Sequence, residues 1–255
     1  MTQVPPTTAQ IYDASAEQWR RTAPVLLSDY TARPFILDWC APLAGARVLD
    51  LGCGEGYVAR QLVERGAARV HGVDVSPEMI ARARQGGDAD GRLSYAVGSA
   101  ADTAWADAGS TDLVVAVFLF NYLQISEMQA VMKQVYTALR PGGTFIFSVP
   151  HPALAFLRPH TPPFYFDAGS HGYFSGRDAL FEGRIWRRDG VGVPVRCIHK
   201  TWADYFGALA AAGFRELPQV QELHVTEEHI ALDPAFFGPL RDVPLHVAMR
   251  IHRPG

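Results

Sequence analysis

The stretch Val48-Leu49-Asp50-Leu51-Gly52-Cys53-Gly54-Glu55-Gly56 decides the fold of this 255-residue chain. A short apolar run predicts a strand over Arg47–Leu51, and three glycines follow it at alternate positions. The apolar residues that come next repeat at helical spacing, which predicts a helix over Gly56–Arg65. Glycine lets the backbone turn tightly and approach a ligand without a Cβ clash. The stretch therefore predicts a strand, a glycine bend and a helix that together can hold a ligand.

Strands and helices continue to alternate along the chain. Further strands are predicted at Val70–Asp74, Leu93–Val97, Leu113–Phe118, Thr144–Val149, about Leu217–Leu223 and about Leu245–Ile251. Helices are predicted in pieces over Ile11–Ala44, from the Ser76-Pro77 step onward, over Ile125–Leu139 and over Thr201–Ala212. This alternation indicates the α/β class, with a doubly wound, mostly parallel sheet of seven strands and helices on both faces. The loops after the strands then meet along one edge, where such folds bind ligands.

The alternation fails between Pro150 and about His199. Five prolines occupy positions 150, 152, 159, 162 and 163, and eight aromatic residues lie in the same stretch. A plain connection of this length is uncommon, so we expect a loop and hairpin insert that lies over the ligand edge as a lid. The chain is then predicted to be one domain over residues 1–255. Its parts are an N-terminal helical cap (1–45), a core (46–149), the insert (150–200) and a C-terminal completion of the sheet (201–255).

The composition argues against several classes of protein. Lys and Arg number 23 against 26 Asp and Glu, and this net charge of −3 does not suit a protein that neutralises nucleic-acid phosphates. No window approaches the ~20 apolar residues of a membrane span, and the N-terminus lacks the features of a secretory signal. Cys40, Cys53 and Cys197 are spaced unlike a disulfide framework or a zinc site. We expect a cytoplasmic protein that binds no metal, nucleic acid or membrane, and the sequence leaves its oligomeric state open.

Two classes of ligand use a glycine bend of this kind. Dinucleotides favour G-x-G-x-x-G, but the sixth position here is Tyr57. Asp50 and Glu55 would also lie beside the pyrophosphate, with no nearby Lys or Arg in the sequence to compensate them. A ligand with an amine and a ribose but no phosphate fits better, since Asp50 can accept from the amine and Asp74, after the next strand, from the ribose. These features favour S-adenosylmethionine.

Five motifs carry a resemblance to a known family. VLDLGCGEG (48–56), GVDVSPEMI (72–80), VGSAADTAW (97–105), TDLVVAVFLFNYL (111–123) and LRPGGTFIFSV (139–149) resemble, in order and spacing, those of class I S-adenosylmethionine-dependent methyltransferases. The likeness is to the branch that includes the ubiquinone/menaquinone-type and many natural-product small-molecule enzymes. It implies a Rossmann-like sheet with the strand order 3-2-1-4-5-7-6 and S-adenosyl-L-methionine as the cofactor.

The same resemblance implies a set of cofactor-binding residues. They are Tyr12, Asp50, Gly52, Cys53, Gly54, Gly56, Asp74, Val75, Met79, Ser99, Ala100, Ala101 and Phe118. The glycines and Asp50 would lie near the methionine part of the cofactor, and Asp74 would hold the ribose. The Tyr12-Asp13 step is similar to one that closes over the cofactor in this branch. The chain departs from the family at Ser99, where relatives usually carry Asp, and at Asn121, where many carry His.

The methyl acceptor is expected to lie under the insert. His151, which follows the fifth strand, and His199, at the start of the next helix, are the candidates for a catalytic base, although each could equally be a structural histidine. Small-molecule pockets are largely apolar and aromatic. The predicted acceptor-binding residues are accordingly the aromatic side chains Tyr122, Phe156, Tyr165, Tyr173, Phe174 and Trp186.

The sequence therefore predicts an enzyme that moves a methyl group to a small, partly apolar or aromatic metabolite by in-line displacement. Because the chain is poor in lysine, with only Lys133 and Lys200, bacterial secondary metabolism is the expected setting. Three alternatives stay open: an RNA-modifying methyltransferase, a non-catalytic module that binds S-adenosylmethionine, and a nicotinamide oxidoreductase.

Overall fold

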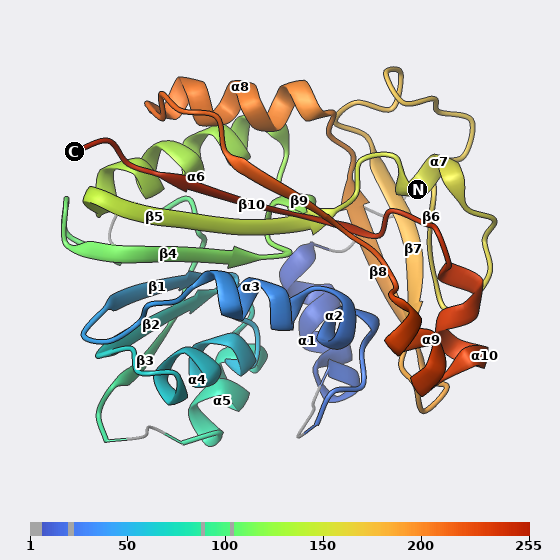
Figure 1. Cartoon of the computed structure of the whole chain (residues 1–255), viewed down its shortest axis with the longest axis horizontal. Coiled ribbons are helices and arrows are strands. Elements are labelled where there is room, and N and C mark those ends of the chain that lie inside the picture. Colours follow the sequence, from blue (N-terminus) through green and yellow to red (C-terminus); the bar gives the residue numbers. More distant parts are fainter. Residues whose placement is uncertain (1–6, 20–22, 88–89, 103–104) are drawn as a thin grey trace, which may run out of the picture.

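Two sheets organise the chain in the computed structural model, which describes residues 7–19, 23–87, 90–102 and 105–255. The larger sheet has seven strands in the order β3-β2-β1-β4-β5-β10-β9, so the order 3-2-1-4-5-7-6 is confirmed (Figure 1). Its strands are β1 (Arg47–Leu51), β2 (Arg69–Asp74), β3 (Leu93–Val97), β4 (Thr111–Val117), β5 (Leu139–Pro150), β9 (Gln219–Leu223) and β10 (His246–His252). The first five run parallel, and β10 is antiparallel to both β5 and β9.

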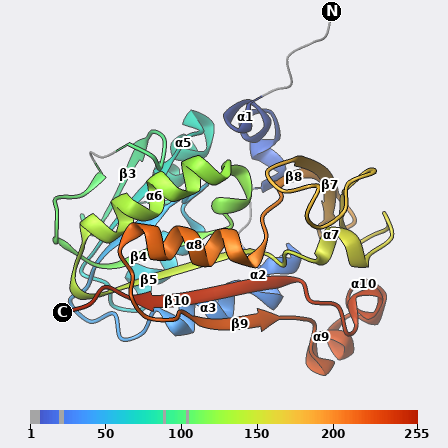
Figure 2. The same cartoon turned by 90° about the horizontal axis from the view of Figure 1, so that it is seen from above.

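Helices cover both faces of this sheet, as the alternation predicts (Figure 2). On one face, α3 (Arg33–Trp39) and α4 (Tyr57–Glu64) pack against apolar side chains of β1, β4 and β5. On the other face, α6 (Ile125–Ala138) and α8 (Trp202–Ala212) cover a second core that contains the stacked rings of Phe145 and Phe147. The central strand β4 is buried along most of its length, because both faces are covered.

Local signals in the sequence set the ends of several elements. Ser76 caps α5 (Pro77–Gln85) by accepting a hydrogen bond from the Met79 backbone N–H at 3.1 Å, and Pro77 stands in the first turn. The predicted N-terminal helix divides into α1 (Thr8–Trp19), α2 (Leu27–Thr31) and α3. None of the helices within the described ranges has the length and apolarity needed to cross a bilayer.

The insert forms more regular structure than a loop and hairpin. It begins with α7 (Leu154–Leu157) and builds a second, antiparallel sheet from β6 (Phe164–Asp167), β7 (Leu180–Trp186) and β8 (Gly192–Ile198). This small sheet packs with α2 and with the helices α9 (Glu227–Leu232) and α10 (Pro234–Phe237) around a third core. The sequence analysis missed β6, α9 and α10, because each is at most six residues long and is stabilised by packing.

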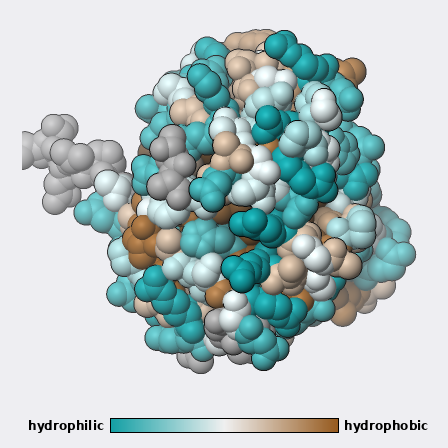
Figure 3. Space-filling view, turned by 90° about the vertical axis from the view of Figure 1, so that its left-hand side faces the viewer, coloured by the Kyte–Doolittle hydropathy of each residue, from teal (hydrophilic) through white to brown (hydrophobic). Residues whose placement is uncertain are grey.

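The two ends of the parallel strands differ. Their amino ends form a face that presents mostly hydrophilic side chains (Figure 3). At their carboxyl ends lie α1, the short 3₁₀ helix η2 (Phe120–Tyr122) and the strands of the small sheet (Figure 1). The carboxyl ends of the strands are therefore the expected place for a ligand, as in other α/β sheets.

Candidate functional site

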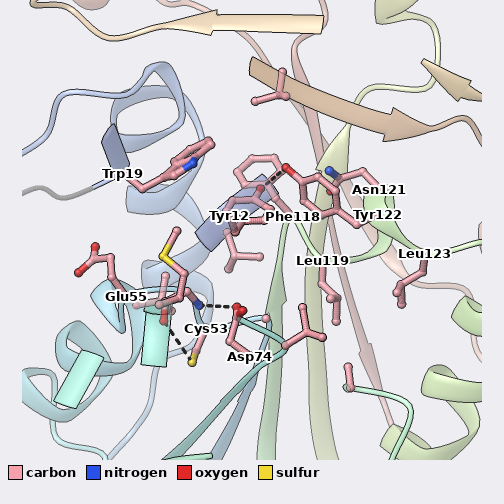
Figure 4. Close-up of a pocket in the computed structure, with 18 of the residues that line it drawn as sticks. Tyr12, Trp19, Cys53, Glu55, Asp74, Phe118, Leu119, Asn121, Tyr122 and Leu123 are labelled. Carbon is pink, nitrogen blue, oxygen red and sulfur yellow. Dashed lines mark hydrogen bonds between the residues drawn. The ribbon is translucent and has the colours of Figure 1, made fainter. Parts of the chain in front are cut away.

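A cavity of about 510 Å³ lies at the carboxyl ends of β1, β2 and β4. It continues from the glycine bend to the inner face of the small sheet, where Phe164, Phe166, Ile185 and Val195 line it. Figure 4 shows these two ends, with Cys53 and Asp74 at one and Tyr12, Phe118, Asn121 and Tyr122 at the other. The residues near the glycine bend are called the polar end below, and those under the small sheet the apolar end.

The glycine bend requires its glycines. Gly54 and Gly56 have φ angles of 55° and 80°, a left-handed region that other residues rarely adopt. A Cβ atom on Gly56 would also lie 2.6 Å from the Tyr95 hydroxyl oxygen. Gly54 donates its backbone N–H to Oδ2 of Asp74 at 2.8 Å, so the bend is attached to the end of β2. The two motifs that the sequence singled out thus meet at one place.

Asp50 lies at the floor of the polar end. It is 1% exposed, and its Oδ2 has no hydrogen-bond partner among the described residues. Burial, and then the negative charge of Asp74, raise the pKa of Asp50 to about 7, while Arg33 acts in the opposite direction. Asp74 accepts from the Ser76 backbone N–H at 2.9 Å as well as from Gly54. An unpartnered carboxylate oxygen in a cavity is a place for a ligand that donates.

Arg33 supplies the opposite charge, and the sequence analysis missed it. Its Nη1 donates to Oδ1 of Asp29 at 3.0 Å and to the Ser28 hydroxyl, while its buried Nε has no partner within the described chain. The guanidinium carbon lies 5.6 Å from the centre of the Phe118 ring. Because Arg33 and Asp50 line the same cavity with one unpartnered donor and one unpartnered acceptor, they match the carboxylate and ammonium of an amino-acid group.

The expectation that no basic residue compensates Glu55 is wrong. Arg60, one turn into α4, donates through Nη2 to Oε2 of Glu55 at 2.6 Å and through Nη1 to the backbone oxygen of the same residue. Glu55 lies just before the N-cap of α4, and Arg60, on the first turn of that helix, reaches back to it. Glu55 is therefore a neutralised group, and the electrostatic argument against a phosphate depends on Asp50.

The N-terminal helix α1 covers the cavity. The Tyr12 hydroxyl donates to the Tyr122 hydroxyl, and the Tyr12 ring lies 5.4 Å from that of Trp19 (Figure 4). Asp13 accepts from the Ser76 hydroxyl at 2.5 Å, which fixes α1 to the start of α5. Burial raises the pKa of both tyrosine hydroxyls, so both stay protonated at neutral pH.

Most of the predicted cofactor residues come together. The cavity is lined by Tyr12, Asp50, Gly52, Cys53, Gly54, Asp74, Val75, Met79, Ser99, Ala100 and Phe118. Gly56 and Ala101 do not line it: Gly56 precedes α4 as its N-cap, and Ala101 packs against the core and donates its N–H to the Ser99 hydroxyl at 3.1 Å. Ser99, at the position where the resemblance leads us to expect Asp, lines the cavity directly.

Of the predicted acceptor residues, only Tyr122 lines the cavity. Tyr165 and Trp186 lie on the opposite face of the small sheet from their neighbours Phe164, Phe166 and Ile185, because successive residues of a strand point to opposite faces. Phe156 and Tyr173 instead pack around the His199 ring, at 5.1 and 5.2 Å. Phe174 is 80% exposed. The insert contributes Phe164, Phe166, Ile185 and Val195 to the cavity, in place of the aromatic residues that the sequence suggested.

Neither predicted base lines the cavity. His151 pairs through Nε2 with Oε1 of Glu222 at 2.8 Å, and its Nδ1 accepts from the Ala153 backbone N–H at 3.1 Å. His199 bonds the Tyr173 carbonyl oxygen through Nε2 at 2.8 Å and stacks on Phe181. Both rings face a separate space of about 10 Å³, which is roughly one water in size. The bonded ring nitrogens of His151 and His199 hold neighbouring backbone and side-chain groups in place. The structure therefore does not support these two histidines as catalytic groups.

A histidine that the sequence did not single out does line the cavity. His246, the first residue of β10, is 2% exposed, and neither ring nitrogen has a partner in the described part of the chain. Its ring lies 5.0 Å from that of Phe118 and 6.0 Å from that of Phe164. Burial lowers the pKa of His246 to about 3, so the imidazole is neutral. Asn121, from η2, joins it there with an unpartnered Oδ1.

A search of residues 7–19, 23–87, 90–102 and 105–255 finds no group of three His, Cys, Asp or Glu side chains placed to hold a metal ion. Among the described residues, the cavity has the unpartnered Oδ2 of Asp50 and Nε of Arg33 at one end, and unpartnered atoms of His246 and Asn121 among apolar side chains at the other.

Part of the chain is similar in sequence to known proteins. Residues 48–143 match the family described as a methyltransferase domain. The chain is 36% identical over 151 residues to a trans-aconitate 2-methyltransferase of Streptomyces avermitilis, covering 54% of this chain and 52% of that protein. It is 32% identical over 123 residues to a ubiquinone biosynthesis O-methyltransferase of Xanthomonas oryzae pv. oryzae, covering 47% and 50%. The chain thus spans about half the length of the curated relatives it matches.

The fold agrees over a longer stretch. The crystal structure of an S-adenosylmethionine-dependent methyltransferase from Mesorhizobium loti superposes with a TM-score of 0.66 and 25% sequence identity. The superposition covers 86% of this chain and 96% of that one, so the likeness extends beyond the residues that match the family.

Proposed function

We propose that this chain, which carries a class I S-adenosylmethionine-dependent methyltransferase domain, transfers a methyl group to a small, partly apolar or aromatic metabolite. One observation carries the proposal: a single cavity joins the polar end at the glycine bend to an apolar end under the small sheet. A donor and an acceptor can therefore meet inside one enclosed space. The volume of about 510 Å³ lies within the range of small-molecule sites.

S-adenosylmethionine is the cofactor of such a domain, and when bound it supplies a methyl group on a sulfonium centre that a nucleophile displaces. The residues of the polar end fit its parts. Asp50 Oδ2 would accept from the ammonium, and Arg33 Nε would donate to the carboxylate. Each oxygen of Asp74 has already accepted one backbone N–H and can accept a second bond from a ribose hydroxyl. Val75 and Met79 would flank the adenine.

The chain's own contribution to methyl transfer is position and the exclusion of water. The helix α1 is held over the cavity by the Asp13–Ser76 bond and by an ion pair of 2.8 Å between Arg82 and Glu17. The left-handed backbone of Phe118, with φ 58°, turns the chain at the carboxyl end of β4 and presents its ring to the cavity. Strain of this kind is common at functional sites. Holding two reactants in line is itself worth several kcal/mol of the barrier.

The alternatives fit less well. A non-catalytic binding module needs no second compartment, whereas the apolar end here continues from the cofactor residues. An RNA-modifying enzyme calls for free cationic side chains near the site. Three arginines of the insert and its vicinity, Arg177, Arg187 and Arg188, are instead paired with carboxylates at 2.6, 2.5 and 3.2 Å. Bacterial secondary metabolism and a cytoplasmic location remain our proposals for the setting.

Two measurements test the proposal. Calorimetric titration with S-adenosylhomocysteine and with NADPH should give saturable binding of the first alone. Incubation with radiolabelled S-adenosylmethionine and a panel of hydroxylated aromatic compounds should then give a labelled product that partitions into organic solvent. Labelling of added RNA with no labelled small molecule would favour the RNA-modifying alternative, and binding of the dinucleotide alone would refute the assignment.

A further inference from the structure

Two buried side chains at the apolar end have polar atoms without a hydrogen-bond partner among the described residues. His246 and Asn121 are each 2% exposed. Within the described chain, both ring nitrogens of His246 and the Oδ1 of Asn121 have no hydrogen-bond partner. Buried polar groups in proteins are nearly always satisfied, because an unsatisfied one costs about 1–3 kcal/mol. Two such residues lining one cavity indicate that a ligand completes their bonds.

Other buried histidines of the same chain show that the fold can satisfy this side chain. His151 is buried to nearly the same degree and lies next to Pro150, the residue that pairs with His246 in the β5–β10 register. Both of its ring nitrogens are bonded, to Glu222 and to the Ala153 backbone. His199 also bonds through its Nε2. The fold can thus provide partners for a buried histidine. His246 differs in that it lines the cavity and has no partner among the described residues.

The residues around His246 indicate whether the ligand group that binds there is charged or neutral. The cation nearest to His246 on the cavity wall is Arg33, which pairs with Asp29 at 3.0 Å and acts on Asp50 at the polar end. The rings of Phe118 and Phe164 pack against the imidazole, and His151 is a further titratable group that acts on it. Burial keeps the pKa of His246 near 3, so the group is neutral and offers one N–H donor and one nitrogen acceptor. A charged ligand group would be costly to bury there.

We propose that His246 and Asn121 bind the methyl acceptor, and that this acceptor is an uncharged, apolar ring compound whose hydroxyl donates a hydrogen bond to Asn121 and accepts one from His246. The inference rests on the proposed methyl transfer and names the class of its second substrate. The hydroxyl proton is donated to Asn121 Oδ1, and the hydroxyl oxygen accepts the N–H of the neutral His246 imidazole. The ring packs on Phe164, Phe166 and Val195. His246 is here a positioning residue.

The first test is thermal stability, and it needs no ligand. His246→Phe removes an unsatisfied polar group from an apolar wall with open space beside it, so the melting temperature should rise by a few degrees. His151→Phe is the matched control, since it breaks two formed bonds, and its melting temperature should fall. A fall for His246→Phe comparable to that of the control would mean that His246 has a structural role, and would overturn the proposal.

The second test uses ligand-observed NMR to measure how tightly three probe compounds bind to the protein saturated with S-adenosylhomocysteine. The probes are p-cresol, which donates, 4-methylanisole, which does not, and p-toluate, which is charged. We expect p-cresol to bind and the other two to bind at least tenfold more weakly. His246→Phe and Asn121→Leu should each weaken p-cresol binding at least fivefold, and His246→Gln, which keeps a donor and an acceptor, should restore part of it. The ¹⁵N resonances of the His246 ring should shift only when p-cresol is added.

The outcomes separate the two proposals. Failure of the wild-type protein to bind S-adenosylhomocysteine would refute the proposed function itself. Normal binding of that compound together with tighter binding of p-toluate, equal binding of 4-methylanisole, or no binding of p-cresol would refute the acceptor assignment alone. Unchanged p-cresol affinity in both His246→Phe and Asn121→Leu would also refute the acceptor assignment alone.

Discussion

The backbone N–H of Gly54 donates to Oδ2 of Asp74 over 2.8 Å, and this bond joins the loops that follow β1 and β2. The two loops come from neighbouring parallel strands, whose register places Leu51 opposite Val73. The Asp74 carboxylate is therefore held in position before any ligand arrives. Its position depends on a glycine whose φ angle of 55° other residues rarely adopt.

Replacement of Asp74 by Ala should weaken binding of S-adenosylhomocysteine by about 10- to 100-fold, since bonds to a charged group are worth roughly 1.5–3 kcal/mol. The change removes both the acceptor for the ribose hydroxyls and the anchor of the glycine bend. Calorimetry with the purified protein measures the effect. Asp107→Ala, at an exposed acid away from the cavity, is the control and should bind normally. Equal affinities of the two variants would exclude the ribose role.

The affinity for S-adenosylhomocysteine should increase with pH between 6 and 8. Burial raises the pKa of Asp50 to about 7, and only its ionised form attracts the ligand's ammonium. The increase is at most about tenfold per pH unit for one proton. Calorimetric titrations at several pH values give the slope, which Asp50→Asn should flatten. A variant that keeps the wild-type slope would assign the dependence to another group.

The stability of the ligand-free protein should respond to Asp50 in the opposite sense. Its folded-state pKa of about 7 lies above the usual pKa of 3.8 for an aspartate, so the unfolded chain ionises first and stability is lost as pH rises between those values. Asp50→Asn removes this cost. The free energy of unfolding of the variant should therefore exceed that of wild type by at least about 1 kcal/mol at pH 8 and by less at pH 5. Urea titrations at the two pH values measure it, and a gain that is larger at pH 5 would contradict the assignment.

A methyl group on Gly56 should be destabilising. The residue has φ 80°, and its Cβ would lie 2.6 Å from the Tyr95 hydroxyl, so Gly56→Ala should cost about 1–3 kcal/mol of unfolding free energy. Gly207, within α8, has open space around its Cβ position and no positive φ. Gly207→Ala should accordingly stabilise the protein by roughly 0.5–1 kcal/mol. Chemical denaturation measures the free energy of unfolding of both variants. If it changed in the same direction in both, the explanation given for Gly56 would be contradicted.

A larger side chain at position 195 should close the apolar end. Val195 on β8 lines the cavity, and Val195→Phe adds a ring within it. We expect binding of S-adenosylhomocysteine to change less than threefold, while p-cresol binding falls at least tenfold. Val191→Phe places the same ring at an exposed position before β8 and should leave both unchanged. Loss of cofactor binding in Val195→Phe alone would mean that the two ends are not separate compartments.

The sequence predicted the parts of the site that local rules determine. The strands around Asp50 and Asp74, the glycine bend and the Ser76 cap all lie within a few residues of the pattern that indicates them. The strand order followed from the resemblance. The strands, the glycine bend and the cap share one property: the residues that define each of them are neighbours in the chain.

The remainder depends on tertiary packing. Tyr165 and Phe166 are adjacent and both aromatic, so only the pairing of β6 with β7 decides which of them faces the cavity. The pairing of β5 with β10 places His246 opposite Pro150, the residue before His151, and Glu222 on β9 bonds His151 and not His246. Arg33 likewise reaches Asp50 only through the packing of α3 beneath the sheet.

The walls of the cavity differ in kind, and this bears on how the protein can evolve. Backbone loops of the large sheet form the glycine bend, which any change in backbone would disturb, whereas alternate side chains of three short antiparallel strands form much of the apolar wall. On the proposed function, mutations at those inward positions can alter which acceptors bind while the cofactor site is inherited intact.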